Sequence, residues 1–96
     1  MNTIWTWDRD KAAANLAKHK VSFDLALRVF GDPWQLSRPD PHLDEERWQT
    51  IGAPFASIPT VLFVVHTEVD EDGYGRIISA RKATPRERKA YEEGEF

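Results

Sequence analysis

The run Val61–Val65, with the sequence Val-Leu-Phe-Val-Val, constrains the fold more than any other segment of the chain. All five side chains are apolar, and most are β-branched or aromatic, which favours a strand. A short apolar run without polar alternation is typical of a strand that is covered on both faces. We therefore expect residues 61–65 to form the central strand of a sheet, with other elements packed on either side.

A second strand is predicted beyond a polar turn. The segment 70–73 has the acidic and glycine-containing composition of a turn, and a strand pattern resumes over residues 76–83. Residues 61–65 and 76–83 should therefore pair as an antiparallel hairpin. Because successive side chains of a strand point to opposite faces, the second strand should divide as follows: Ile78 and Ala80 on one face, and Ile77, Ser79 and Arg81 on the other.

The first third of the chain predicts a strand followed by two helices. Residues 4–7 have the apolar and aromatic character of a strand. Residues 11–18 should form a helix, and residues 23–30 a second helix whose apolar side chains recur at i, i+3, i+4 and i+7. The capping residues are Asp8 or Asp10 for the first helix and Ser22 for the second.

The remaining segments complete an α+β domain. Residues 35–38 and 47–51 alternate like strands, and Thr84-Pro85-Arg86-Glu87 is a capping box that opens a helix ending by Gly94. This order predicts an antiparallel sheet of about four strands, packed with N-terminal helices and a C-terminal helix. With 96 residues we expect a single domain, 1–96, whose thin core disfavours a deep pocket.

Composition excludes several kinds of site. The chain has no cysteine, which removes disulfides, thiolate ligands and thiol nucleophiles. Its three histidines, His19, His42 and His66, are too scattered for an HExxH-type site, and neither a glycine-rich loop before a helix nor GxSxG occurs. We therefore expect no metal and no cofactor.

The chain has no long apolar run and no leader pattern, so a cytosolic protein is expected.

Charge is distributed unevenly along the chain. The net charge is −3, yet residues 76–91 hold six basic residues and one acidic residue, which is a net +5. The acidic residues gather at 40–46, 68–72 and 92–95. Two interpretations stay open: a solvated helix face balanced by its acidic tail, or a surface that binds a polyanion.

The side chains available for chemistry are acids, bases and cations, which can cleave RNA with the substrate's own 2′-hydroxyl as nucleophile. That reaction needs a base, cations beside the phosphate and an acid for the leaving oxygen. Lys18-His19-Lys20 places an imidazole between two cations, although these cations could simply favour a helix C-terminus. Glu45-Glu46-Arg47 places a base beside a guanidinium, although it could be a solvated turn.

We expect a further anion-binding site at the end of the 76–83 strand, because this strand leads into the N-terminus of the last helix. Arg81 and Lys82 end this strand. We expect catalytic roles for His19, Glu46, Arg47, Arg81 and Tyr91, and RNA-binding roles for Lys18, Lys20, Lys82, Arg86 and Arg88. His42 and His66 are expected to be structural or surface residues.

Taken together, these segments resemble the BrnT family of bacterial toxins from type II toxin–antitoxin modules. The matching pieces are Trp7-Asp8 with Lys11, Asn15 and Lys18-His19; Val21-Ser22-Phe23 with Ala26 and Val29-Phe30; Glu46-Arg47 with Gly52; and Ile77 to Thr84 with Glu87-Arg88 and Tyr91. The last piece is the most specific. Lys20 stands where the family usually has glycine, so the turn after His19 is expected to differ.

The resemblance implies a RelE-like fold and an endoribonuclease that cleaves RNA with little sequence preference and arrests translation. It also implies a DNA-binding antitoxin, which we expect to be a BrnA-like ribbon-helix-helix protein in a 2:2 complex. No membrane partner is expected. The alternative is a non-catalytic toxin of the same fold, or one that targets gyrase as ParE-like toxins do. A direct DNA-binding protein is disfavoured by the acidic net charge and the lack of a helix-turn-helix pair.

Overall fold

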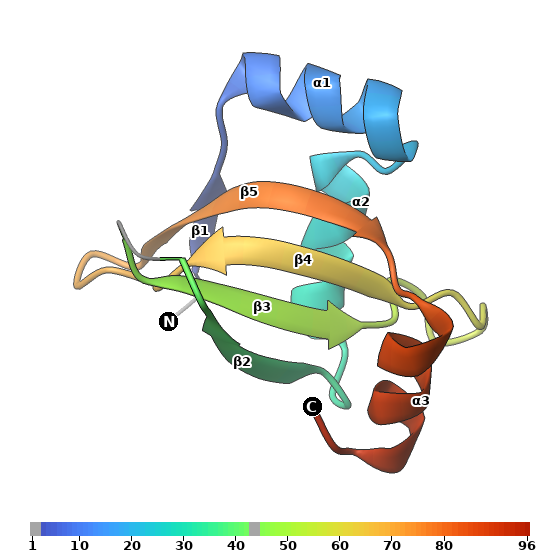
Figure 1. Cartoon of the computed structure of the whole chain (residues 1–96). Helices are drawn as coiled ribbons and strands as arrows, with labels where there is room; N and C mark the ends of the chain where they lie inside the picture. The colour runs from blue at the N-terminus through green and yellow to red at the C-terminus, as the bar shows by residue number, and fades with distance from the viewer. Residues whose placement is uncertain (1–2, 43–44) are drawn as a thin grey trace.

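The computed structural model is built around the predicted hairpin, with helices on both faces of one sheet (Figure 1). The structure describes residues 3–42 and 45–96. Its elements, in chain order, are β1 (Ile4–Thr6), α1 (Arg9–His19), α2 (Phe23–Leu27), the 3₁₀ turn η1 (Arg28–Gly31), β2 (Leu36–Asp40), β3 (Arg47–Gly52), β4 (Leu62–Thr67), β5 (Tyr74–Lys82) and α3 (Pro85–Glu93).

The strands lie in the order β1-β5-β4-β3-β2, and the α+β class is confirmed. Strands β2 to β5 pair antiparallel, but β1 pairs with β5 in parallel. Over residues 3–42 and 45–96 the sheet thus has five strands rather than about four, and the expectation of a wholly antiparallel sheet is wrong at the β1 edge. The pattern of residues 4–7 predicts a strand but does not indicate which strand it pairs with. Glycine at position 75 makes room for the pairing of β1 with β5, because a Cβ there would lie 2.5 Å from the ring of Trp5.

A bulge at Ile78 changes the predicted faces of β5. The pairing of β5 with β4 shifts register between Val65 and His66, which leaves Ile78 as the extra residue. Ile77 and Ala80 consequently share one face, where they are 2% and 0% exposed in the core beneath α1 and α2. The expected separation of Ile77 from Ala80 is therefore wrong, since the extra residue reverses the alternation.

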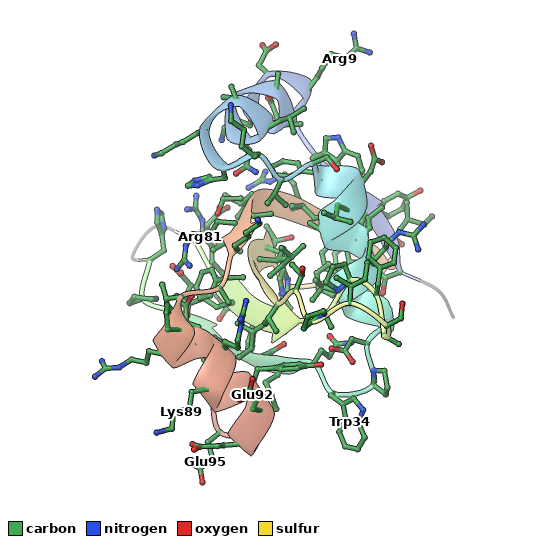
Figure 2. The ribbon with its side chains drawn as sticks, turned by 90° about the vertical axis from the view of Figure 1, so that its right-hand side faces the viewer. Arg9, Trp34, Arg81, Lys89, Glu92 and Glu95 are labelled. Atoms are coloured by element: carbon green, nitrogen blue, oxygen red, sulfur yellow. The ribbon has the colours of Figure 1, made fainter. Side chains whose placement is uncertain are left out.

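Strand β4 lies at the centre of the sheet and is covered on both faces, as the apolar run predicts. The larger core lies beneath α1 and α2 and consists of Val21, Phe23, Ala26, Val29, Leu62, Val64, Ile77 and Ala80. The smaller core, on the opposite face, consists of Ile51, Val61 and Phe63, with Ala90, Tyr91 and Phe96 packed against it. We call this second side the α3 face. Figure 2 shows α3 and α2 on opposite sides of the sheet.

The first two helices begin at predicted caps. Asp8, not Asp10, caps α1 by accepting a hydrogen bond from the backbone N of Lys11 at 3.0 Å. Ser22 caps α2 in the same way. The second helix is shorter than expected, because regular α-helix ends at Leu27 and the chain continues as the 3₁₀ turn η1.

The last helix has the predicted capping box. The side chain of Thr84 accepts from the backbone N of Glu87, whose side chain accepts from the backbone N of Thr84. Gly94 ends the helix in the left-handed conformation, with φ of 71°. Strand β2 begins and ends later than expected and contains Pro39, which an edge strand tolerates because it need not donate on its outer side.

Lys20 takes the conformation that glycine would take at the end of α1. Its φ is 61°, and its backbone N donates to the carbonyl of Leu16 at 2.9 Å. The expectation that the turn after His19 departs from the glycine-containing turn is therefore wrong. The hydrogen bond that ends the helix holds a residue with a Cβ in the left-handed region, at a cost of about 1 kcal/mol.

Candidate functional site

Three rows of side chains cross the α3 face between β2 and β5. The strand register places Leu36, Ile51, Phe63 and Arg81 in the first row, Arg38, Gln49, Val65 and Ser79 in the second, and Asp40, Arg47 and Thr67 in the third. The face therefore carries an arginine on each of β2, β3 and β5. Guanidinium groups spread over one sheet face suit a ligand with several negative charges.

Arg81 is held in place at the end of β5. Its Nη1 and Nη2 donate to the two carboxylate oxygens of Glu87 at 2.7 and 3.0 Å, and its guanidinium carbon lies 4.1 Å from the ring centroid of Phe63. Burial would raise the pKa of Glu87, but the hydrogen bonds from Arg81 and from the backbone of Thr84 lower it overall. The Nε of Arg81 donates to none of the described residues, so it can bind an anion.

A second group of charges shares the carboxylate of Glu45 at the other end of the sheet. Arg47 donates its Nε to Oε1 of Glu45 at 2.8 Å, and Arg76 donates Nη2 to both oxygens at 3.1 and 3.2 Å. The hydrogen bond from Arg47, with the charge of Arg76, holds the pKa of Glu45 below its usual value. Two cations on one carboxylate leave this cluster with a net positive charge.

Glu46 lies on the exposed surface next to this cluster. It lines a shallow pocket with Asp40, His42, Trp48 and Glu68, among others. A hydrogen bond and charge repulsion from the Glu46 carboxylate raise the pKa of Glu68. Glu68 therefore holds a proton more readily than an isolated carboxyl group does.

The structure does not bring Arg47 and Arg81 together. Arg81 lies opposite Phe63 on β4, whereas Arg47 lies opposite Thr67, and the two arginines are two strands apart. At about 3.3 Å per residue and about 4.8 Å per strand, they are separated by roughly 13 Å along the strands and roughly 10 Å across them. They cannot contact one phosphate together, but they can contact different phosphates of one strand.

Tyr91 packs on the smaller core and ties α3 to the loop after η1. Its hydroxyl donates to Oδ2 of Asp32 at 2.6 Å, and Asp32 also accepts from the backbone N of Ala53 at 2.8 Å and of Trp34 at 3.0 Å. Burial and the hydrogen bond to Asp32 raise the pKa of Tyr91 to about 12. Burial would raise the pKa of Asp32, but its three hydrogen bonds, led by the one from Tyr91, lower it overall.

His19 is half-buried at the last turn of α1. Figure 1 places this end of α1 on the same side of the molecule as the end of β5, and the start of β3 on the opposite side. Asn15, one turn earlier, fixes the helix on β5: its amide exchanges hydrogen bonds of 2.8 and 3.1 Å with the backbone of Ala80. The end of α1 that carries His19 thus lies toward the same end of the sheet as Arg81, although α1 packs on the face opposite the α3 face, and Glu46 lies at the other end.

The five residues expected to bind RNA also lie toward the end of the sheet where Arg81 lies. Lys18 and Lys20 end α1, Lys82 ends β5, and Arg86 and Arg88 lie in the first turns of α3; all five are exposed. Figure 2 shows Arg81 between α1 and α3. These elements come from opposite ends of the sequence, and the sheet brings their basic ends to one side of the molecule.

Arg38 is a residue of the α3 face that the sequence reasoning missed. Its place two residues after Leu36, on the predicted strand 35–38, was the available signal. The acidic residues that follow it, which give residues 35–46 a net charge of −3, hid it, and its packing against Phe96 depends on a contact between segments far apart in the sequence.

No group of three or more metal-ligating side chains occurs within residues 3–42 and 45–96. His66 is buried, as expected of a structural residue: its Nδ1 donates to the carbonyl of Thr67 at 2.9 Å, and its Nε2 accepts from the hydroxyl of Thr50 at 2.6 Å.

Among the helices that the structure describes, none has the length and apolarity needed to cross a membrane.

Comparison with known proteins gives one family. The family model of the ribonuclease toxin BrnT of type II toxin–antitoxin systems matches residues 7–87. The match begins at Trp7, just after β1, and ends at Glu87 in the first turn of α3, so it includes the end of α1, Arg81 and the arginines that share Glu45. No curated protein matches the chain.

Proposed function

Because the chain belongs to the BrnT family of ribonuclease toxins of type II toxin–antitoxin systems, we propose that it is a metal-independent endoribonuclease that arrests translation by cleaving RNA. The observation that carries the proposal is Arg81. Its guanidinium is fixed by Glu87 and Phe63, keeps its Nε edge open, and lies beside exposed basic residues of α1 and α3.

The scissile phosphate binds at Arg81 in this proposal. The substrate's 2′-hydroxyl oxygen attacks phosphorus and loses its proton to a base, while the bond from phosphorus to the 5′-oxygen breaks and that oxygen gains a proton. The products are a 2′,3′-cyclic phosphate and a 5′-hydroxyl. Arg81 stabilises the negative charge that develops on the phosphate oxygens.

His19 is the proton-transfer residue that we assign to the phosphate at Arg81, since the end of α1 lies toward the same end of the sheet as the end of β5. Glu46 and Arg47 are too distant from Arg81 to act on that phosphate, and contact the RNA farther along its chain. The variants His19→Gln and Glu46→Gln separate these roles: the first should lower the rate of cleavage, and the second should mainly change RNA binding. The reverse pattern would place the chemistry at Glu46.

The test of the function is cleavage of total RNA by the purified chain in EDTA. The wild type should degrade the RNA, and Arg81→Ala should be slower by about a hundredfold to a thousandfold while remaining folded. Arg9→Ala, on the first turn of α1, is the matched control and should cleave normally. Intact RNA with the wild type, or full activity in Arg81→Ala, would refute the assignment.

The family also implies an antitoxin partner. We infer that a ribbon-helix-helix antitoxin dimer holds two toxin chains and silences them by covering the α3 face. Charge supports this arrangement, because a basic surface around Arg81 attracts an acidic partner and speeds association. Mass measurement of the co-purified complex tests the 2:2 composition.

A further inference from the structure

Arg38 and Phe96 form a second cation–aromatic pair on the α3 face. The guanidinium carbon of Arg38 lies 4.0 Å from the ring centroid of Phe96. Its Nε donates to Oε1 of Gln49 at 2.7 Å, and Gln49 donates its Nε2 to Asp40 at 2.7 Å. This chain of contacts orients the guanidinium group although Arg38 is exposed.

Two parts of the Arg38 guanidinium remain available to a ligand. Neither Nη atom donates a hydrogen bond within residues 3–42 and 45–96. Phe96 covers one face of the group, which leaves the opposite face to the solvent. Arg38 can therefore offer a flat surface for stacking and an edge for a phosphate at the same time.

The pair is connected to the Arg81 site through aromatic rings. The ring of Phe96 packs edge-to-face on Phe63 with centroids 6.3 Å apart, and Phe63 carries the guanidinium of Arg81. Arg38, Phe96, Phe63 and Arg81 thus form a continuous line across the sheet from β2 to β5. A single-stranded chain bound at Arg81 would meet Arg38 next if it crossed the sheet.

We propose that Arg38, supported by Phe96, is an RNA-binding site that takes one unpaired nucleotide of the substrate bound at Arg81. The base stacks on the open face of the guanidinium, and a phosphate oxygen accepts from its Nη edge. Unpaired bases stack on guanidinium planes as they do on aromatic rings. The inference rests on the proposed function, and Phe96 lies outside the residues matched by the family model.

The chemistry of the pair favours RNA over an acidic peptide. A carboxylate would use the Nη edge of Arg38 but would leave the flat face without a partner. A nucleotide uses both, because it carries a planar ring and an anion on one unit. The nearby Arg81 supplies the next positive charge for a chain of phosphates.

The test is equilibrium binding of a short, fluorescein-labelled 2′-O-methyl RNA, which lacks the nucleophilic hydroxyl and is not cleaved. Arg38→Ala should weaken binding by about tenfold to a hundredfold, and Phe96→Leu should weaken it less. Arg38→Lys keeps the charge but not the plane, so it should weaken binding while leaving the salt dependence unchanged. Arg38→Ala should make the logarithmic salt slope shallower by about 0.7.

Arg28→Ala is the matched control, because Arg28 also lies over a phenylalanine, Phe55, at 4.8 Å, but on η1 rather than on the α3 face. It should bind the oligonucleotide like the wild type. Binding by Arg38→Ala and Arg38→Lys that equals the wild type would overturn the inference, and so would a loss of antitoxin binding alone, which would make the pair a protein-binding site. A wild type that binds through Arg38 but never cleaves RNA would refute the proposed function and leave this site standing.

Discussion

The carboxylate of Glu87 accepts a hydrogen bond from each Nη atom of Arg81, which ties the end of β5 to the first turn of α3. Glu87 at the same time closes the capping box of α3 with Thr84. One side chain therefore sets both the start of the helix and the direction of the arginine. The interaction uses the Nη edge of Arg81 and leaves its Nε edge to the ligand.

Replacing Glu87 with Gln should lower cleavage without removing Arg81. The amide retains one acceptor but loses the charge that holds both Nη atoms, so Arg81 becomes more mobile. We expect a roughly tenfold lower rate at saturating RNA, measured beside Glu92→Gln, an exposed substitution on the same helix (Figure 2). Equal rates for these two variants would show that Arg81 does not need this contact.

The hydrogen bond between Tyr91 and Asp32 should contribute to stability. Tyr91→Phe leaves the buried carboxylate of Asp32 without one of its three donors, and should lower the free energy of unfolding by about 1–3 kcal/mol. Urea denaturation measures this loss. If Tyr91 acts only by holding α3, cleavage at a temperature where the variant is folded should be almost unchanged; a large loss of rate there would instead give its hydroxyl a role in catalysis.

Lys20→Gly should stabilise the protein. Glycine adopts the left-handed conformation at φ of 61° without the Cβ penalty, so the free energy of unfolding should rise by about 1 kcal/mol. Lys18→Gly, inside the last turn of α1, is the control and should destabilise by about 1 kcal/mol. A melting temperature that falls in Lys20→Gly would contradict this account of the turn.

The sequence predicts elements better than contacts in this chain. The run at 61–65, the capping box at Thr84 and the cap at Ser22 are local signals, and each appears in the structure close to its expected place. The parallel pairing of β1 and the bulge at Ile78 depend on neighbours that lie far away in sequence, so local patterns do not reveal them.

For the candidate site, too, the sequence predicts single residues better than their arrangement in space. Residue type and position in the sequence pointed to Arg81 and to the basic ends of α1 and α3 as candidates. Their spatial division, with Glu46 and Arg47 at one end of the sheet and His19 and Arg81 at the other, follows from strand register, which a single sequence does not specify. Arg38 was missed for this reason, since Phe96 meets it only in the folded chain.

Acid should destabilise the fold through His66. Burial lowers the pKa of His66 below its ordinary value of 6.5, so the unfolded chain binds a proton on this residue more readily than the folded chain does. The stabilising contribution is complete above about pH 6.5 and is lost as the pH falls through the folded pKa. The free energy of unfolding should therefore decrease between about pH 7 and pH 5, with a smaller decrease in His66→Gln.

Asp32 and Glu87, whose pKa values are also lowered, reduce the stability only at lower pH, where their carboxylates gain protons. An identical decrease in His66→Gln would show that another group is responsible.

Antitoxin binding should protect the backbone amides of residues 76–91 from hydrogen exchange. This segment contains most of β5 and most of α3, and it carries Arg81 together with the first-turn cations of the helix. An inhibitor that works by covering the basic surface must contact these residues, and acidic side chains would satisfy the charge. The control segment is the acidic turn at 68–74, whose exchange should stay the same in the complex. Protection confined to that turn would mean that the antitoxin leaves the Arg81 surface open and inhibits by another route.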